Sequence, residues 1–84
     1  TGWNQVHPLR PNPFFKDLED GSYAYFNHSY TCNPAIRQDV LAETEYGATF
    51  ASIVNQDNLY GVQFHPEKSQ RVGLTLLANF LELA

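Results

Sequence analysis

A histidine and a glutamate stand two residues apart near the end of the sequence, His65 and Glu67, with Pro66 between them. On an extended segment such side chains leave the same side of the backbone, with Cα atoms roughly 6.5 to 7 Å apart. A glutamate can reach the imidazole across that distance, orient the ring and stabilise its charged form. The other ring nitrogen can then take a proton from a nucleophile. The pair therefore predicts two of the three members of a catalytic triad.

The third member, a nucleophile, is not evident. Cys32 is the only cysteine, and it precedes Asn33-Pro34 without the glycines of a tight strand-to-helix elbow. The favoured interpretation of Cys32 is a small, weakly polar packing residue. A single cysteine also excludes an internal disulfide, so a reducing compartment such as the cytoplasm is expected.

Metal-ligating side chains are present but scattered. His7, His28 and His65 lie 21 and 37 residues apart, and neither they nor Cys32 form a short ligand pair. Zinc sites usually contain such pairs. Neither a metal nor another cofactor is therefore predicted.

The composition favours a folded, soluble protein. Hydrophobic residues make up 43% of the 84 residues and aromatic ones 14%, against 17% charged, which argues against disorder. The net charge of −4, without a basic cluster, argues against nucleic acid as the main partner. No apolar run has transmembrane length, and no signal peptide is evident. The chain contains no methionine and opens on Thr1, so we expect a segment of a longer protein.

The first half of the sequence predicts one strand after an irregular start. Residues 7–13 contain three prolines and predict an extended or irregular connection, and residues 14–20 predict a short helical turn. The aromatic run 22–30 predicts a strand. Its alternation places Ala24, Phe26, His28 and Tyr30 on one face and Tyr23, Tyr25, Asn27 and Ser29 on the other.

The second half predicts further strands. Residues 36–42 alternate as a half-exposed strand that ends near 46–47, and residues 48–54 are a short apolar run. The polar residues 55–58 predict a hairpin turn into a strand over 59–65. In that strand Tyr60, Val62 and Phe64 share one face, opposite Gly61, Gln63 and His65.

A helix is predicted to close the sheet. Ser69 is the expected N-cap, and the helix runs to about Leu83. The fold class expected is α/β, a mixed sheet closed by a C-terminal helix, whose uncovered face needs a further layer. The predicted apolar face of the helix consists of Val72, Leu76, Leu77, Phe80, Leu81 and Leu83.

Three segments resemble a known family. The stretch YGVQFHPEKS at 60–69 resembles, residue for residue, the catalytic His and Glu segment of class I glutamine amidotransferases. GWNQV at 2–6 and YFNHSY at 25–30 are similar to the glutaminase subunits of imidazole glycerol phosphate synthases, except at Asn27, where an apolar residue is usual. The resemblance implies that residues 1–84 are the C-terminal half of one flavodoxin-like domain.

The resemblance implies hydrolysis of glutamine to glutamate and ammonia through a cysteine thioester. His65 would activate the cysteine and protonate the leaving ammonia, and Glu67 would orient His65. The cysteine is expected upstream of Thr1. The same resemblance implies that His28, Ser29 and Tyr30 bind the amino-acid end of glutamine. It also implies that Trp3, Asn4, Tyr25 and Lys68 face a (β/α)8 barrel cyclase subunit or domain.

Blander interpretations remain for these positions. The segment 28–30 also fits an aromatic strand with a core histidine, Trp3 and Tyr25 fit packed aromatics, and Lys68 fits a solvated cation. Another class I amidotransferase, supplying ammonia to guanylate, carbamoyl phosphate, anthranilate or pyridoxal phosphate synthesis, is the nearest alternative, although GWNQV and HSY argue against it. The missing nucleophile motivates a third hypothesis, a non-catalytic binding module.

Overall fold

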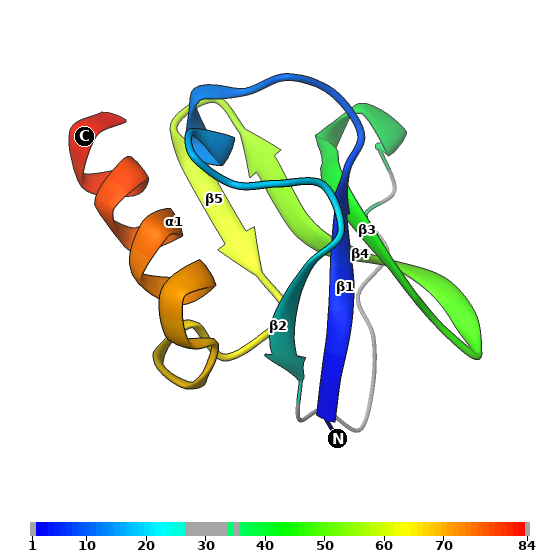
Figure 1. The fold of residues 1–84 in the computed structure, drawn as a ribbon. Coiled ribbons are helices and arrows are strands. Elements are labelled where there is room, and N and C mark those ends of the chain that lie inside the picture. The colour runs from blue at the N-terminus through cyan, green and yellow to red at the C-terminus, as the bar shows by residue number, and fades with distance from the viewer. Residues whose placement is uncertain (1, 27–33, 35, 84) are drawn as a thin grey trace.

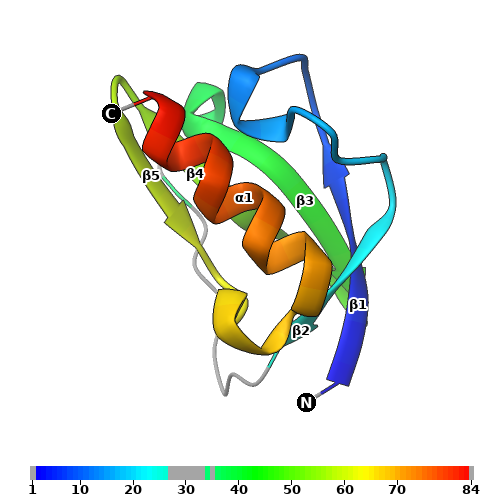
Figure 2. The same ribbon diagram turned by 60° about the vertical axis from the view of Figure 1, so that its left-hand side comes forward.

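The computed structural model describes residues 2–26, 34 and 36–83, which form a curled sheet with one long helix against it (Figures 1 and 2). The strand order is β2-β1-β3-β4-β5, and every pairing among the described residues is antiparallel. The expected α/β fold class is confirmed, although the pairings seen are antiparallel instead of mixed. The elements are β1 (Gly2–Pro8), η1 (Pro13–Phe15), β2 (Ser22–Phe26), η2 (Arg37–Asp39), β3 (Val40–Tyr46), β4 (Ala48–Gln56), β5 (Leu59–Val62), η3 (Pro66–Lys68) and α1 (Gln70–Leu83).

Strand β1 was not predicted, and it lies inside the sheet between β2 and β3. The expectation of an extended or irregular connection over residues 7–13 missed the strand pairing of His7 and Pro8, which pair with Glu43 and Ala42. Pro8 is the last residue of the strand, so its missing N–H removes a ladder hydrogen bond only at the strand's end. Three prolines in seven residues therefore mark the end of a strand here.

Strand β3 departs from the expected alternation. Residues 37–39 form the turn η2, and Val40, Leu41 and Ala42 are all at most 3% exposed. The register against β4 shifts between Val40 and Glu43, and such an irregularity turns neighbouring side chains toward different covered surfaces. A strict alternation from 36 to 42 was therefore the wrong prediction.

The remaining strands follow the sequence pattern closely. Ala24 and Phe26 of β2, which the alternation places on one face, are both buried, and the predicted hairpin between β4 and β5 is present, with Gln56 paired to Leu59. Strand β5 ends at Val62, earlier than predicted. Beyond it the Gln63 N–H still donates to the Ser52 carbonyl at 2.9 Å, so the chain continues along the sheet.

The core lies between the curled sheet and helix α1. Ring contacts connect Phe26 to Phe50 and to Phe64, with centroids 5.7 and 5.6 Å apart. The buried Asn79 of α1 donates two hydrogen bonds of 2.8 Å, to the carbonyls of Phe14 and Lys16, and so fastens the helix to η1. The buried cluster consists of Val6, Phe14, Phe15, Ala24, Phe26, Leu41, Ala42, Phe50, Ile53, Phe64 and Leu76.

The predicted apolar face of α1 is only partly covered. Leu76 is buried and Val72 packs against the core, but Leu77 and Leu81 are 48% and 73% exposed. The buried residues of the helix are Gly73, Leu76 and Asn79, on the side that faces the sheet and η1. Within the described residues no helix has both the length and the apolar character needed to cross a bilayer.

Candidate active site

The structure brings His65 and Glu67 together just beyond the end of β5. The Nδ1 atom of His65 lies 3.1 Å from Oε2 of Glu67, and the side chains are 38% and 65% exposed. Pro66 is the first residue of η3 and has a fixed φ, so the chain turns sharply between the two side chains. When Nδ1 carries the proton it donates to the carboxylate, and Nε2 is left to accept a proton from another group.

Backbone hydrogen bonds place this turn against β2. The His65 N–H donates to the Tyr25 carbonyl at 2.9 Å. Strands β2 and β5 lie at opposite edges of the sheet in the strand order. The sheet is curled enough for the segment after β5 to reach β2. Since His65 lies at this junction, the position of its backbone depends on both edges.

Ser69 has a different role from the predicted N-cap. It immediately precedes α1, and its carbonyl accepts the N–H of Gly73 at 3.5 Å, as expected for that position. Its hydroxyl, however, donates to the His65 carbonyl at 2.6 Å and accepts the Tyr25 N–H at 2.9 Å. The hydroxyl thus connects β2 to the turn and does not accept a hydrogen bond from the N–H groups in the first turn of the helix.

Gly73 allows α1 to approach the turn closely. A Cβ atom at this position would lie 1.9 Å from the Pro66 carbonyl oxygen and 2.7 Å from its carbon. Only a glycine fits against backbone at that distance. A glycine within a leucine-rich helix, four residues after Ser69, is the sequence signal by which this contact could have been found.

The environment of Glu67 favours its ionised form. A hydrogen bond from its own backbone N–H is the largest cause of a lowered pKa, and desolvation, the next largest, acts in the opposite direction. The hydrogen bond and charge of His65 and the charge of Lys68 make smaller contributions that also lower the pKa. Together they lower the pKa of Glu67 below its usual 4.5. The carboxylate that contacts the imidazole therefore remains charged into mildly acidic solution.

We expect an NMR titration of the Glu67 carboxyl carbon to show a midpoint below 4.5. Because the folded pKa is lower than the unfolded one, the stability contributed by this group is complete above the unfolded value. It is lost as the pH falls through the folded value. In the variant His65→Ala the midpoint should rise only partly, since the backbone hydrogen bond remains. A wild-type midpoint at or above 4.5 would contradict this account.

An aromatic surface adjoins the pair. The ring of Tyr25 lies 6.5 Å from that of His65 and 5.6 Å from that of Trp3, and the Lys68 Nζ lies 5.9 Å from the Tyr25 centroid. Trp3 is 44% exposed. Asn4 pairs with Ala24 and, by the alternation of β1, projects from the opposite face to Trp3. Of the four predicted interface residues, three therefore lie together and Asn4 lies apart.

Several predicted positions lie outside the described residues. These are the proposed glutamine-binding residues His28, Ser29 and Tyr30, together with Asn27 and Cys32.

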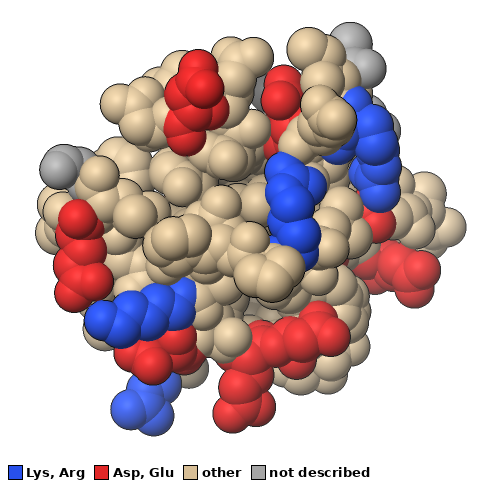
Figure 3. Space-filling model, turned by 90° about the horizontal axis from the view of Figure 1, so that it is seen from above, with Lys and Arg blue, Asp and Glu red and all other residues tan. Residues whose placement is uncertain are grey.

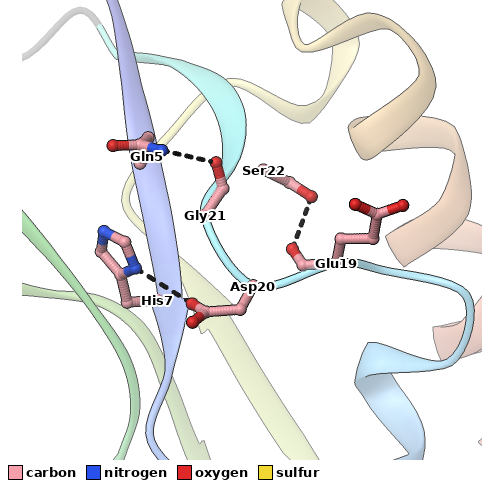
Figure 4. A network of polar contacts seen from close by, with 6 residues as sticks. All are labelled: Gln5, His7, Glu19, Asp20, Gly21 and Ser22. Atoms are coloured by element: carbon pink, nitrogen blue, oxygen red, sulfur yellow. Dashed lines mark hydrogen bonds and ion pairs between the residues drawn. The ribbon is translucent and has the colours of Figure 1, made fainter.

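A second histidine and carboxylate pair lies on β1. The Nδ1 of His7 is 3.0 Å from Oδ1 of Asp20, in a group of contacts that also holds Gln5 against Gly21 and Ser22 against Glu19 (Figure 4). These contacts fasten the connection before β2 to β1. Across the described ranges no three histidine, cysteine or acidic side chains gather as a metal site would require.

Charged side chains are dispersed over the face seen in Figure 3. Lysine and arginine alternate there with aspartate and glutamate, and the basic groups form no continuous patch. On this face the distribution agrees with the net charge of −4 in offering no track for a phosphate backbone.

A comparison with known protein families identifies the family of this chain. The model of "Glutamine amidotransferase class-I" matches residues 1–84. The chain belongs to the class I glutamine amidotransferases. The resemblance noted in the segment 60–69 is thereby confirmed at the level of the family.

Among the class I amidotransferases, similar proteins carry the name imidazole glycerol phosphate synthase subunit HisH. The protein from Caulobacter vibrioides is 48% identical over 81 residues, covering 96% of this chain and 38% of that protein. The one from Salinibacter ruber is 51% identical, with 98% and 38% covered, and the one from Methanocaldococcus jannaschii is 45% identical, with 98% and 41% covered. The chain thus spans about two fifths of the length of these relatives.

Proposed function

We propose that the chain supplies the histidine and glutamate of a glutaminase site in an imidazole glycerol phosphate synthase, for histidine biosynthesis. The observation that carries the proposal is the 3.1 Å contact between His65 Nδ1 and Glu67 Oε2, in a chain of this family. The identity to relatives named as synthase subunits supports the choice of synthase.

The nucleophile is a cysteine from a part of the protein outside these 84 residues. Its thiol proton passes to Nε2 of His65, and the thiolate attacks the side-chain amide carbon of glutamine. His65 then gives the proton to the leaving nitrogen as the carbon–nitrogen bond breaks, which releases ammonia and leaves a thioester. Water, deprotonated by the same imidazole, hydrolyses the thioester to glutamate and restores the thiol.

Glu67 performs no proton transfer in this scheme. Its carboxylate accepts a hydrogen bond from Nδ1–H, which keeps Nε2 directed toward the nucleophile and stabilises the imidazolium formed during attack. The lowered pKa of Glu67 suits this task because the carboxylate must remain ionised while His65 gains and loses a proton. His28, Ser29 and Tyr30 are proposed to hold the amino-acid end of glutamine.

The partner we propose is a (β/α)8 barrel cyclase that receives the ammonia. Trp3, Tyr25 and Lys68 would face it, because an exposed indole, a tyrosine ring and a cation form one surface next to His65. Tryptophan and tyrosine are enriched in protein interfaces, and Asn4 would contribute only from the margin.

The test uses the full-length polypeptide that contains this chain. Glutamate formation is measured alone and with an imidazole glycerol phosphate cyclase barrel, and complex formation is followed by sedimentation. We expect a stable complex and glutamine hydrolysis within it. Binding to another ammonia-consuming synthase in place of the barrel would favour a different amidotransferase. Absence of glutamate under both conditions would favour a non-catalytic module.

A further inference from the structure

We propose that Ser69 is a positioning residue, whose hydroxyl holds His65 in place for the proposed reaction; the inference rests on the proposed function. The hydroxyl donates to the His65 carbonyl at 2.6 Å and accepts the Tyr25 N–H at 2.9 Å. It is therefore a bridge between the backbone of β2 and the backbone of His65 itself. Neither contact involves a group that reacts.

Burial makes the bridge costly to remove. Ser69 is 1% exposed, so water does not have free access to the groups that it serves. Alanine at this position would leave the Tyr25 N–H and one acceptor site of the His65 carbonyl without their partner. An unsatisfied buried polar group is unfavourable, so the local backbone should shift until other partners are found.

The hydrogen bonds around Ser69 indicate that the backbone shift would affect His65 in particular. The Tyr25 carbonyl accepts the His65 N–H at 2.9 Å, so Tyr25 and His65 are joined both directly and through the Ser69 hydroxyl. These bonds form a closed ring that fixes both the nitrogen and the carbonyl of His65. Without the hydroxyl, His65 keeps the direct bond to Tyr25 and the bond from the Lys68 N–H to its carbonyl at 3.1 Å. Its carbonyl, however, is no longer linked to β2, so the residue is freer to shift relative to that strand.

The consequence for catalysis is a change in kcat more than in KM. Proton transfer requires Nε2 within hydrogen-bond distance of the nucleophile, and a misplacement of about 1 Å can reduce a rate about 100-fold. Glutamine binding does not require the proton on Nε2. We therefore expect Ser69→Ala in the full-length enzyme with its cyclase to lower kcat about 10- to 100-fold with little change in KM.

Ser22→Ala is the matched control. The Ser22 hydroxyl also donates to a backbone carbonyl, that of Glu19, at 2.6 Å (Figure 4). Ser22 is the first residue of β2, the strand that contains Tyr25. The chemical change is identical, but no bond to His65 is lost, so kcat should remain at the wild-type value. Ser69→Thr keeps the hydroxyl and should recover most of the activity that Ser69→Ala loses.

Two spectroscopic measurements are independent of turnover. Amide hydrogen exchange of Tyr25 should become faster in Ser69→Ala, because its acceptor is gone. The Nδ1 proton signal of His65, which reports the contact with Glu67, should shift or broaden, whereas that of His7, paired with Asp20, should not change.

The outcomes separate this inference from the proposed function. If wild-type enzyme shows no glutaminase activity but the Tyr25 exchange and the His65 signal respond, the function is wrong and the positioning of His65 stands. If the Tyr25 exchange rate and the His65 proton signal are both unchanged in Ser69→Ala, the inference is overturned. It is also overturned if activity falls equally in Ser22→Ala. A normal kcat in an active Ser69→Ala enzyme overturns it as well.

Discussion

Replacing Gly73 with alanine is expected to destabilise the protein by about 3 kcal/mol or more and to impair the site. The new Cβ would lie 1.9 Å from the Pro66 oxygen, and the atoms it meets are backbone, which cannot rotate away. Either α1 or the turn must move, and the turn holds His65 and Glu67. Urea denaturation of the full-length protein measures the first effect, and a glutaminase assay measures the second.

Whether Gly73→Ala lowers or raises the free energy of unfolding distinguishes this site from an ordinary helix interior. In an ordinary helix interior, glycine to alanine stabilises by roughly 0.5 to 1 kcal/mol. Leu74→Ala, at the neighbouring helical position with a side chain 70% exposed, is the control and should change stability little. If Gly73→Ala were neutral or stabilising, the close approach of the helix to Pro66 would be refuted.

The largest expected effect on activity belongs to His65→Ala. Removing the group that takes the thiol proton and returns it to ammonia should lower kcat by about 10²- to 10⁴-fold. Glu67→Gln should also reduce kcat while leaving the fold intact, because the side chain is exposed and its shape is conserved. The assay follows glutamate release by the full-length protein with the cyclase present.

His7→Ala is the control for His65→Ala. His7 has a carboxylate on Nδ1 at nearly the same distance, 3.0 Å, but lies in a different part of the sheet. Its removal should leave glutamine hydrolysis unchanged. Full activity in His65→Ala would remove His65 from the mechanism, and an equal loss in both variants would point to a general effect on folding.

The sequence was sufficient where the chemistry is local. His65 and Glu67 meet because they are two residues apart, although they do so across the turn η3 and not on the extended segment that was expected. The motif around them identifies the family. The hairpin before β5 and the helix after Ser69 also follow from local turn and periodicity signals. Each of these depends on residues within a window of up to about 18 positions, which is the range of such patterns.

The supports of the site could not be predicted in the same way. Ser69 contacts Tyr25 across 44 residues of sequence, and Asn79 contacts Phe14 across 65. A serine before a helix is an ordinary N-cap by local rules, so only the curl of the sheet shows that its hydroxyl is used elsewhere. Strand β1 was missed for a related reason, because its partners come later in the chain and the prolines at its end and just beyond it dominate the local signal.

The shifted register of β3 affects how the protein can be labelled. A regular strand offers every second side chain to solvent, where a fluorophore or spin label can be attached without disturbing the interior. From Val40 to Ala42 no such position exists. The tip of the β3–β4 hairpin offers one instead, since Tyr46 is 62% exposed. A probe there would report on the sheet from outside and leave the ring of bonds around His65 untouched.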